Sequence, residues 1–389
     1  MASVIAATIV VAGATPAHAE EDYPSWADVE AAKHDEKLKK AQIAKIEDLI
    51  AGLEDTDAAL AKAALEVAEN YNIAQQAADD AADAADDLAD QVEAADAAAA
   101  ESGKQAAAVV TAIARTGTQD LTLTLLTNGE NADDLLYSLG LMSKVSESAT
   151  AIYDTAVQDR NTASALSAQA DVAQDEREKL ADTAKATFDD AKAASDAAAA
   201  VVAKQKARAK KLYDQLASLK GTTSDLEKAY QEGLAWEKAQ EAVKHPPTAP
   251  PLDVVPPAPS ANAVEGAIAF AKAQLGEQYV LGGAGPDVWD CSGLTGAAYS
   301  SVGVYIGTHS ATNQYSTMAA ANRLLPLDQL VPGDLLFYSN GGSLTGTKYH
   351  TAMYVGGGQM IEAPYPGATV RIKAIRYGDL VPYAGRPTP

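Results

Sequence analysis

Cysteine, phenylalanine and tryptophan are scarce in this chain, which has one Cys, three Phe and three Trp among 389 residues. One cysteine excludes an internal disulfide framework and a cysteine-rich zinc module. So few large rings argue against one continuous core, and a chain of this length usually divides into domains of about 100–200 residues. Basic residues are also few, with 30 Lys and Arg against 53 Asp and Glu and a net charge of −23. This balance argues against nucleic-acid binding, because phosphate backbones are bound by clustered Lys and Arg.

Long hydrophobic runs are absent as well. No stretch of the sequence has about 18 consecutive apolar residues, the length that a membrane-spanning helix needs, so no permanent anchor is expected. The apolar stretch from Val4 to Ala14 is followed by Ala17-His18-Ala19, which has the form of a signal-peptide cleavage site. No Lys or Arg precedes Val4. Either the true start lies upstream, or the amino terminus supplies the only positive charge. Residues 1–19 are therefore predicted to be a signal peptide of a secreted protein.

Proline is absent from residues 25–245, and these 221 residues hold only 7 of the 27 glycines. Such a composition permits long helices, because a proline in a helix interior costs about 3 kcal/mol or more. Seven prolines then fall within 246–259, as is typical of a semi-rigid polyproline II linker. The composition predicts a helical region at 20–245, a linker at 246–261 and a separate domain at 262–389, which holds 19 glycines.

The negative charge belongs to the first part of the chain. Residues 262–389 have 7 basic and 8 acidic residues, a net charge of −1, which leaves −22 of the total −23 for residues 1–261. The aspartates between 79 and 90 are predicted to form a solvated helix face. Calcium binding is the alternative, but the glycine-containing loop of such sites is missing there.

A heptad pattern runs from Ile43 to Ala99. Of its seventeen positions, which follow alternating steps of three and four residues, sixteen are uncharged and only Asp57 interrupts the seam. Apolar heptads sustained over this length predict a coiled coil. Many of the positions are alanine, which lets helix axes approach closely, as in antiparallel pairing. A second seam between Val202 and Tyr230 supplies the other arm, so residues 20–245 are predicted to form a long antiparallel coiled-coil hairpin.

Between the two arms, glycines and clustered leucines replace the alanine-rich pattern. Residues 104–145 are therefore predicted to form a small helical lobe at the far end of the hairpin. Two interpretations remain open. The lobe can be a folded-back tip with its own core, or a docking site for a partner, since short amphipathic helices with exposed leucines suit helix-in-groove recognition.

Residues 262–389 alternate short helical and strand-like runs with glycine turns. Val264 to Leu275 has the pattern of an amphipathic helix, and strands are predicted at 335–338, 351–355 and 359–362. This pattern predicts an α+β domain that is large enough for a core of its own.

The single cysteine is a candidate nucleophile. A loop that ends at Cys291 and enters a helix would place the sulfur at a helix N-terminus, where the dipole and free amides favour the thiolate. Such a thiolate needs an acid–base partner. His350 is the leading candidate, Glu362 could orient its ring, and His309 competes as the base or lines the pocket. The alternatives are a small buried Cys291, an ordinary strand histidine, and a zinc site from these four residues, whose spacing is not compact.

Four motifs together cover nearly the whole of this domain. They are GEQYVLGG at 276–283, DCSGL at 290–294, PGDLLF at 332–337 and HTAMYVG at 350–356, which continues into MIEAP at 360–364. With these motifs, residues 262–389 are similar to the NlpC/p60 family of cysteine peptidases, which have a papain-like core and act on cell-wall peptides.

The resemblance implies a role for each matching residue. Cys291 would be the nucleophile, His350 the base and Glu362 the third member, at a position that the family fills with His, Asn, Gln or Glu. One further set would contact the oxyanion or the stem peptide: Tyr279, Asp290 and Ser292. Leu281 and Gln278 stand where many members have Trp and Pro. Because both flank the substrate groove, these departures bear on side-chain preference rather than on the chemistry.

The order of signal peptide, coiled coil, Pro-rich linker and NlpC/p60 domain is similar to that of actinobacterial Rip-type endopeptidases, and most similar to their RipC branch. This resemblance implies a peptidoglycan endopeptidase that cleaves the D-γ-glutamyl–meso-diaminopimelate bond during cell division and daughter-cell separation, without a metal or organic cofactor. It also implies a partner, the extracellular part of FtsX in the FtsEX complex, which would meet the lobe. We expect the hairpin or linker to cover the Cys291 groove until that partner binds. A non-catalytic wall-binding scaffold and a thioester-using transferase are the alternatives.

Overall fold

The computed structural model describes residues 24–116, 132–244, 246–247, 250 and 258–388. The predicted signal peptide, the middle of the predicted lobe and most of the predicted linker lie outside these residues. Contacts divide the chain into two compact units. The first comprises 1–66, 194–307 and 314–389, and the second comprises 67–193 with 308–313. None of the described helices has an apolar window long enough to cross a membrane.

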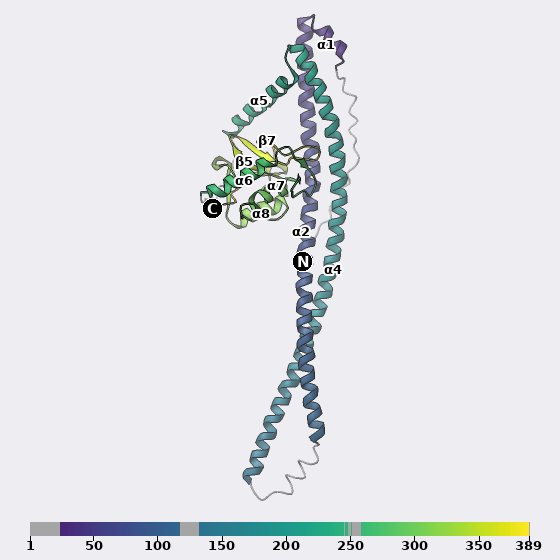
Figure 1. Ribbon diagram of the computed structural model, residues 1–389, viewed down its shortest axis with the longest axis vertical. Helices are drawn as coiled ribbons and strands as arrows, with labels where there is room; N and C mark the ends of the chain where they lie inside the picture. Colours follow the sequence, from purple (N-terminus) through teal and green to yellow (C-terminus); the bar gives the residue numbers. More distant parts are fainter. Residues whose placement is uncertain (1–23, 117–131, 245, 248–249, 251–257, 389) are drawn as a thin grey trace. The chain divides into compact units, whose positions relative to one another are not determined.

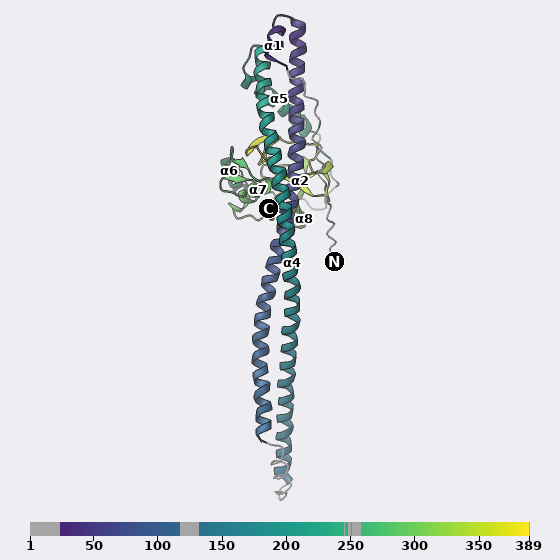
Figure 2. The same cartoon turned by 90° about the vertical axis from the view of Figure 1, so that its right-hand side faces the viewer.

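The first part of the chain is helical, as the lack of proline predicts. Two helices, of 81 and 89 residues, form the arms of a hairpin and run alongside one another in both views (Figures 1 and 2). Ser25 begins the first short helix with a capping box, in which Ser25 and Asp28 satisfy each other's backbone amides. The helices of this part are α1 (Trp26–Ala32), α2 (Glu36–Thr116), α4 (Ala132–Lys220) and α5 (Ser224–Val243).

In the first unit, the predicted seams of the two arms meet. The buried cluster of this hairpin core consists of Val29, Ala32, Ile46, Ile50, Leu53, Leu212, Tyr213, Leu216 and Leu219. Lys220 closes this end by donating to Glu47 (2.8 Å) and Glu227 (3.0 Å). Large aliphatic side chains therefore pack between the two arms, which confirms the predicted antiparallel helical pair in this unit.

In the second unit, small side chains hold the two arms. Ala78, Ala85 and Ala184 are buried, and the larger contacts are isolated, such as the edge-to-face pair of Tyr71 and Phe188 with ring centroids 5.2 Å apart. The six aspartates at 79, 80, 83, 86, 87 and 90 are all exposed. The predicted solvated face is therefore confirmed.

The predicted lobe at 104–145 is described only at its two ends, so it stays a prediction. Residues 104–116 continue α2 and residues 132–145 belong to α4, while 117–131 lie outside the described residues. Gly103 and Gly140 lie inside these helices. A glycine in a helix interior costs only about 1 kcal/mol, so these two residues do not end the arms.

The C-terminal part is an α+β domain, with a six-stranded antiparallel sheet in the order β3-β8-β4-β5-β6-β7 and a separate parallel pair, β1-β2. Its helices are α6 (Ala261–Ala273), α7 (Cys291–Ser300) and α8 (Ala311–Ala320), with 3₁₀ turns η1 (Leu327–Gln329) and η2 (Asn340–Gly342). Its strands are β1 (Gln278–Tyr279), β2 (Val288–Trp289), β3 (Leu324–Pro326), β4 (Leu335–Ser339), β5 (Lys348–Gly356), β6 (Gln359–Glu362), β7 (Arg371–Ala374) and β8 (Tyr383–Gly385).

The three predicted strands are confirmed as β4, β5 and β6, and the predicted helix as α6. Every residue of β4 is buried because this strand lies between β5 and β8, which explains its uninterrupted apolar sequence. The strand starts from a turn in which Gly333 has φ +98° and Asp334 pairs with Arg386 through two bonds of 2.9 Å. A Cβ at position 333 would lie 2.7 Å from Val264. This turn therefore requires a glycine and aligns the strand beside β5.

Candidate active site

Cys291 is the first residue of α7 and is 4% exposed. The helix starts there because Asp290 is its N-cap: the Asp290 Oδ1 accepts from the Gly293 amide (2.8 Å) and from the Ser292 hydroxyl (3.1 Å). The other carboxylate oxygen, Oδ2, accepts from the Gly282 amide at 3.1 Å. Asp290 therefore fixes both the start of the helix and the preceding loop. The sulfur lies at the positive end of the helix dipole, as the sequence predicts, and this position favours the thiolate.

A buried amide side chain fixes the first turn of the same helix. Gln314 on α8 donates to the Ser292 carbonyl (2.9 Å) and accepts from the Thr295 hydroxyl (2.9 Å). Gln314 is fully buried. Sequence reasoning missed this residue, because Gln314 lies among other polar residues of a short helix and nothing in the local sequence marks it. The pair of bonds limits rotation of the turn that carries Cys291.

His350 is the third residue of β5, the strand against which α7 packs. Its side chain is fully buried, and its cross-strand partner is Tyr338 of β4, whose ring centroid lies 5.5 Å away. The Nε2 atom is 2.8 Å from the Oε2 of Glu362. The Nδ1 atom has no hydrogen-bond partner among the described residues. Because Glu362 is an acceptor, the proton is placed on Nε2, which leaves Nδ1 as the basic nitrogen.

Glu362 ends β6 with a fully buried carboxylate. Arg371 is its register partner on β7, and its Nε donates to Oε1 at 3.0 Å. Arg376 binds the carboxylate in a fork, from Nη1 to Oε1 and from Nη2 to Oε2, both at 2.9 Å. Sequence reasoning missed both arginines. The pairing of β6 with β7 was the signal that could have found Arg371, whereas Arg376 lies beyond the strand.

These charges set the ionisation of the two acid–base groups. Burial by itself would raise the pKa of Glu362, but the charges of Arg376 and Arg371 and the His350 hydrogen bond hold it well below its usual range. Burial lowers the pKa of His350. The two arginines act in the same direction, and Glu362 opposes them. The site therefore contains an ionised carboxylate beside an imidazole that is neutral at neutral pH.

The remaining predicted residues have different positions. Tyr279 is 5% exposed and lies on β1, paired with Trp289 of β2, the strand that ends just before the Cys291 helix. Asp290 and Ser292 are buried and bonded to each other at the start of α7, so their contacts to a stem peptide stay a prediction. His309 is half-buried in the bend before α8 and belongs to the second unit. Its role as a competing base or as a pocket residue stays a prediction.

Metal-binding side chains do not cluster in the described ranges. No group of three or more His, Cys, Asp or Glu residues there could hold a metal ion. The conceivable zinc set of Cys291, His309, His350 and Glu362 is therefore not assembled in this conformation.

Comparison with known proteins identifies a family for part of the chain. Residues 276–382 match the NlpC/P60 family. The chain is 36% identical to the peptidoglycan endopeptidase RipA of Mycolicibacterium smegmatis over 138 residues, which are 32% of this chain and 26% of that protein. It is 32% identical to the peptidoglycan endopeptidase RipB of Mycobacterium tuberculosis over 179 residues, which are 42% of this chain and 70% of RipB.

Solved structures are also similar to part of this chain. The structure of the peptidoglycan hydrolase RipB from Mycobacterium tuberculosis is 27% identical, with a TM-score of 0.29, covering 42% of this chain and 86% of that one. The chain spans only 18–26% of the length of several relatives, among them RipA and the probable endopeptidase p60 of Listeria grayi.

Proposed function

Because this chain belongs to the NlpC/P60 family, we propose that it is a cysteine peptidase that hydrolyses the stem peptides of peptidoglycan. One observation carries the proposal, the environment of the buried His350. Its Nε2 is bound to Glu362, and its Nδ1 has no hydrogen-bond partner within the described residues. The strand that holds His350 packs against the Cys291 helix. A non-catalytic scaffold would not need a basic histidine nitrogen on a strand that packs against the helix of the single cysteine.

The proposed reaction has two steps. Neutral His350 first takes the proton of the Cys291 thiol on Nδ1, which gives a thiolate and an imidazolium. The Cys291 thiolate attacks the carbonyl carbon of the scissile bond, and the oxyanion is stabilised by the Cys291 backbone amide and by Tyr279. The imidazolium of His350 gives its proton to the leaving amine, which leaves a thioester on Cys291. Neutral His350 then takes a proton from water, and the resulting hydroxide displaces Cys291 and releases the carboxylate product.

The bond and the place of action follow from the family resemblance. We propose that the substrate is the D-γ-glutamyl–meso-diaminopimelate bond, and that the protein acts as a secreted enzyme of the cell wall at the division site. Mass spectrometry of muropeptide products tests the reaction and the bond together, because hydrolysis adds one water at the cleaved bond. Products coupled to an added amine, without added water, would instead establish a transferase. Cleavage at another bond would contradict the substrate assignment.

Side chains of the hairpin contact the C-terminal domain within the first unit. Lys62 of α2 forms an ion pair with Asp379 (2.7 Å), which also accepts from the hydroxyl of Tyr349, the neighbour of His350 (2.9 Å). Leu65, one turn further along α2, is 3% exposed and belongs to the hydrophobic cluster of that domain. On the other arm, Lys206 donates to the Gly367 carbonyl at 2.7 Å.

The second unit contains a further contact of α2. The buried carboxylate of Glu69 accepts from the Ser310 hydroxyl (2.5 Å) and from the amides of Ala311 (3.1 Å) and Thr312 (2.9 Å), where α8 begins. Burial raises the pKa of Glu69. The negative charge of Glu69 is stabilised at the N-terminus of α8. Burying this carboxylate costs free energy and offsets part of that stabilisation, so the Glu69 contact can be broken without a large loss of free energy.

We propose that these contacts restrain the enzyme in an inactive conformation. Replacing Leu65 with aspartate puts a charge into the hydrophobic contact, so full-length protein is expected to cleave wall peptide about tenfold faster, since about 1.4 kcal/mol changes a population ratio tenfold. The matched control is Leu38→Asp on the same helix, where the side chain is already 53% exposed. Equal rates for Leu65→Asp and the unchanged protein would rule out this restraint.

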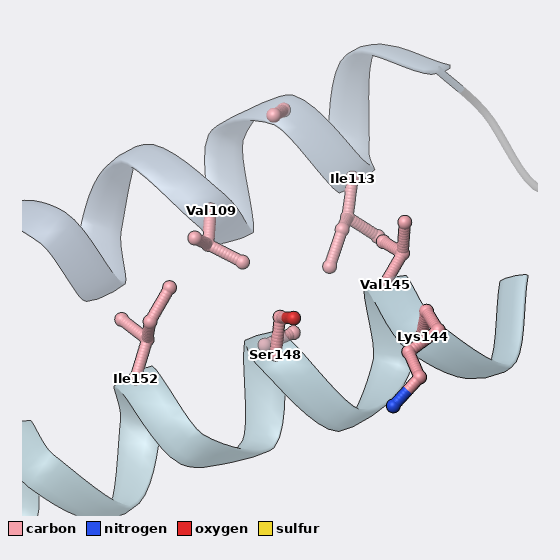
Figure 3. Close-up of a pocket in the computed structure, with 8 residues that line it drawn as sticks. Val109, Ile113, Lys144, Val145, Ser148 and Ile152 are labelled. Atoms are coloured by element: carbon pink, nitrogen blue, oxygen red, sulfur yellow. The ribbon is translucent and has the colours of Figure 1, made fainter. Parts of the chain in front are cut away.

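Apolar side chains gather near the Thr116 end of α2 and the Ala132 end of α4. Figure 3 shows Val109 and Ile113 of α2 facing Val145 and Ile152 of α4. These side chains line an open groove of about 330 Å³. Other exposed apolar residues in this region are Val110, Leu136, Tyr137, Leu139, Leu141 and Met142. We propose that the partner implied by the resemblance, the extracellular part of FtsX, docks here and releases the restraint.

The docking proposal is tested by titrating the purified FtsX extracellular domain into full-length protein. Ile113→Asp or Val145→Asp is expected to weaken binding at least about tenfold, because a buried charge removes a central apolar contact. Val172→Asp is the control, since Val172 lies on α4 and is 69% exposed, outside the groove. Unchanged affinity in both groove variants would exclude this surface.

A further inference from the structure

The carboxylate of Glu362 has more partners than the orientation of one histidine requires. A single hydrogen bond to Nε2 would hold the ring, yet two guanidinium groups also bind the same two oxygens. The carboxylate is fully buried, whereas the side chains of Arg371 and Arg376 are 29% and 43% exposed. The arginines therefore lie between the buried acid and the solvent.

The positions of the two arginines are fixed by different elements. Arg371 lies directly opposite Glu362 in the β6–β7 pairing. Arg376 follows β7 and places its guanidinium 5.0 Å from the ring centroid of Tyr338. Tyr338 is also the cross-strand partner of His350. One tyrosine ring thus contacts both the arginine that binds Glu362 and the histidine that Glu362 binds.

We propose, on the premise of the proposed peptidase function, that Arg371 and Arg376 are positioning residues of the Cys291 reaction. Their guanidinium groups hold both oxygens of Glu362 so that Oε2 accepts the Nε2 proton of His350. This arrangement fixes one tautomer and leaves Nδ1 to exchange the proton with the Cys291 sulfur and the leaving group.

The two arginines also determine how basic the imidazole is. The titratable and charged groups on the elements around His350 are Cys291 (α7), Tyr338 (β4), Glu362 (β6), Arg371 (β7) and Arg376 (after β7). A glutamate alone would stabilise the imidazolium. Two cations on that glutamate offset its charge, so the ring releases the proton to the leaving amine more readily. Removing one cation therefore raises the pKa of His350, provided that Glu362 stays ionised through the other.

The test is an NMR titration of His350 in full-length protein with ¹³C-labelled histidine, its signal identified among the five histidines by comparison with His350→Asn. Arg376→Gln is expected to raise the titration midpoint by about one pH unit, and Arg371→Gln to raise it in the same direction. Arg376→Lys keeps the charge and loses the fork, so its midpoint should stay close to that of the unchanged protein. For Arg376→Gln, kcat on wall peptide is expected to fall about tenfold with little change in KM, since the guanidinium acts through Glu362 and His350.

Lys373→Gln is the charge-matched control. Lys373 lies between the two arginines in sequence, on β7, but pairs with Glu232 rather than Glu362. Its loss should leave the midpoint unmoved. Midpoints that do not move in either glutamine variant, each shown to be folded by circular dichroism, would overturn the proposal. Shifted midpoints in a protein that cleaves no wall peptide would instead retain the positioning role of the arginines and reject the peptidase function.

Discussion

Replacing Cys291 with alanine is expected to reduce muropeptide hydrolysis at least about 10³-fold, because the nucleophile that forms the thioester is lost. The chain has no other cysteine that could substitute for it. The measurement is the rate of product formation by mass spectrometry, with wall peptide and full-length protein. Since Cys291 begins α7 and its side chain is small, the fold should be retained.

A control on the same helix separates loss of chemistry from damage to the helix. Gly296 lies in α7, and a Cβ there would meet only Gln314, at an ordinary contact distance of 3.7 Å. Gly296→Ala should therefore keep most of the activity. Hydrolysis that persists in Cys291→Ala would exclude the thioester mechanism.

Replacing Glu362 with alanine is expected to reduce both stability and activity. The substitution leaves the Nε2 of His350 without its acceptor and two arginines without their shared anion. Breaking a buried ion pair from one side costs about 3–5 kcal/mol, and the partial exposure of the arginines puts the expected loss near the lower figure. Hydrolysis should fall at least about 10²-fold, because the imidazole loses its fixed tautomer. Denaturant unfolding and the product assay measure the two effects.

Glu362→Gln is the milder variant, since an amide oxygen can still accept from Nε2. Stability and activity close to those of Glu362→Ala would contradict a role for the hydrogen bond. Stability and activity equal to the unchanged protein would contradict a role for the charge.

The stability supplied by Glu362 depends on pH in a defined direction. Its pKa is held below the ordinary value of 4.5 by Arg376 and Arg371 against the effect of burial. The ionised carboxylate therefore contributes its full stability above pH 4.5, and this contribution is lost as the pH falls below that value toward the folded-state pKa. The difference in unfolding free energy between the unchanged protein and Glu362→Gln should accordingly shrink in acid.

Much of the fold could be predicted because it follows from local periodicity. The aliphatic seam positions around Ile46 and Leu216 are the residues that pack in the hairpin core. The short apolar runs correspond to β4, β5 and β6, whose bounds differ from the predicted ones by at most three residues. The length of the two arms was harder to predict, since glycines inside long helices resemble helix ends although their cost is too small to end a helix.

The reactive groups could be read from short stretches of sequence: one thiol that follows a helix-capping aspartate, and a histidine on a strand twelve residues before a glutamate. Their surroundings depend on contacts between distant segments. Arg376 reaches Glu362 from the segment after β7, and Gln314 reaches the Cys291 turn from another helix. Leu65 comes from a helix more than two hundred residues away in sequence. Secondary structure follows largely from neighbours along the chain, whereas the charge, burial and access of a reactive group depend on side chains that meet only when the chain has folded.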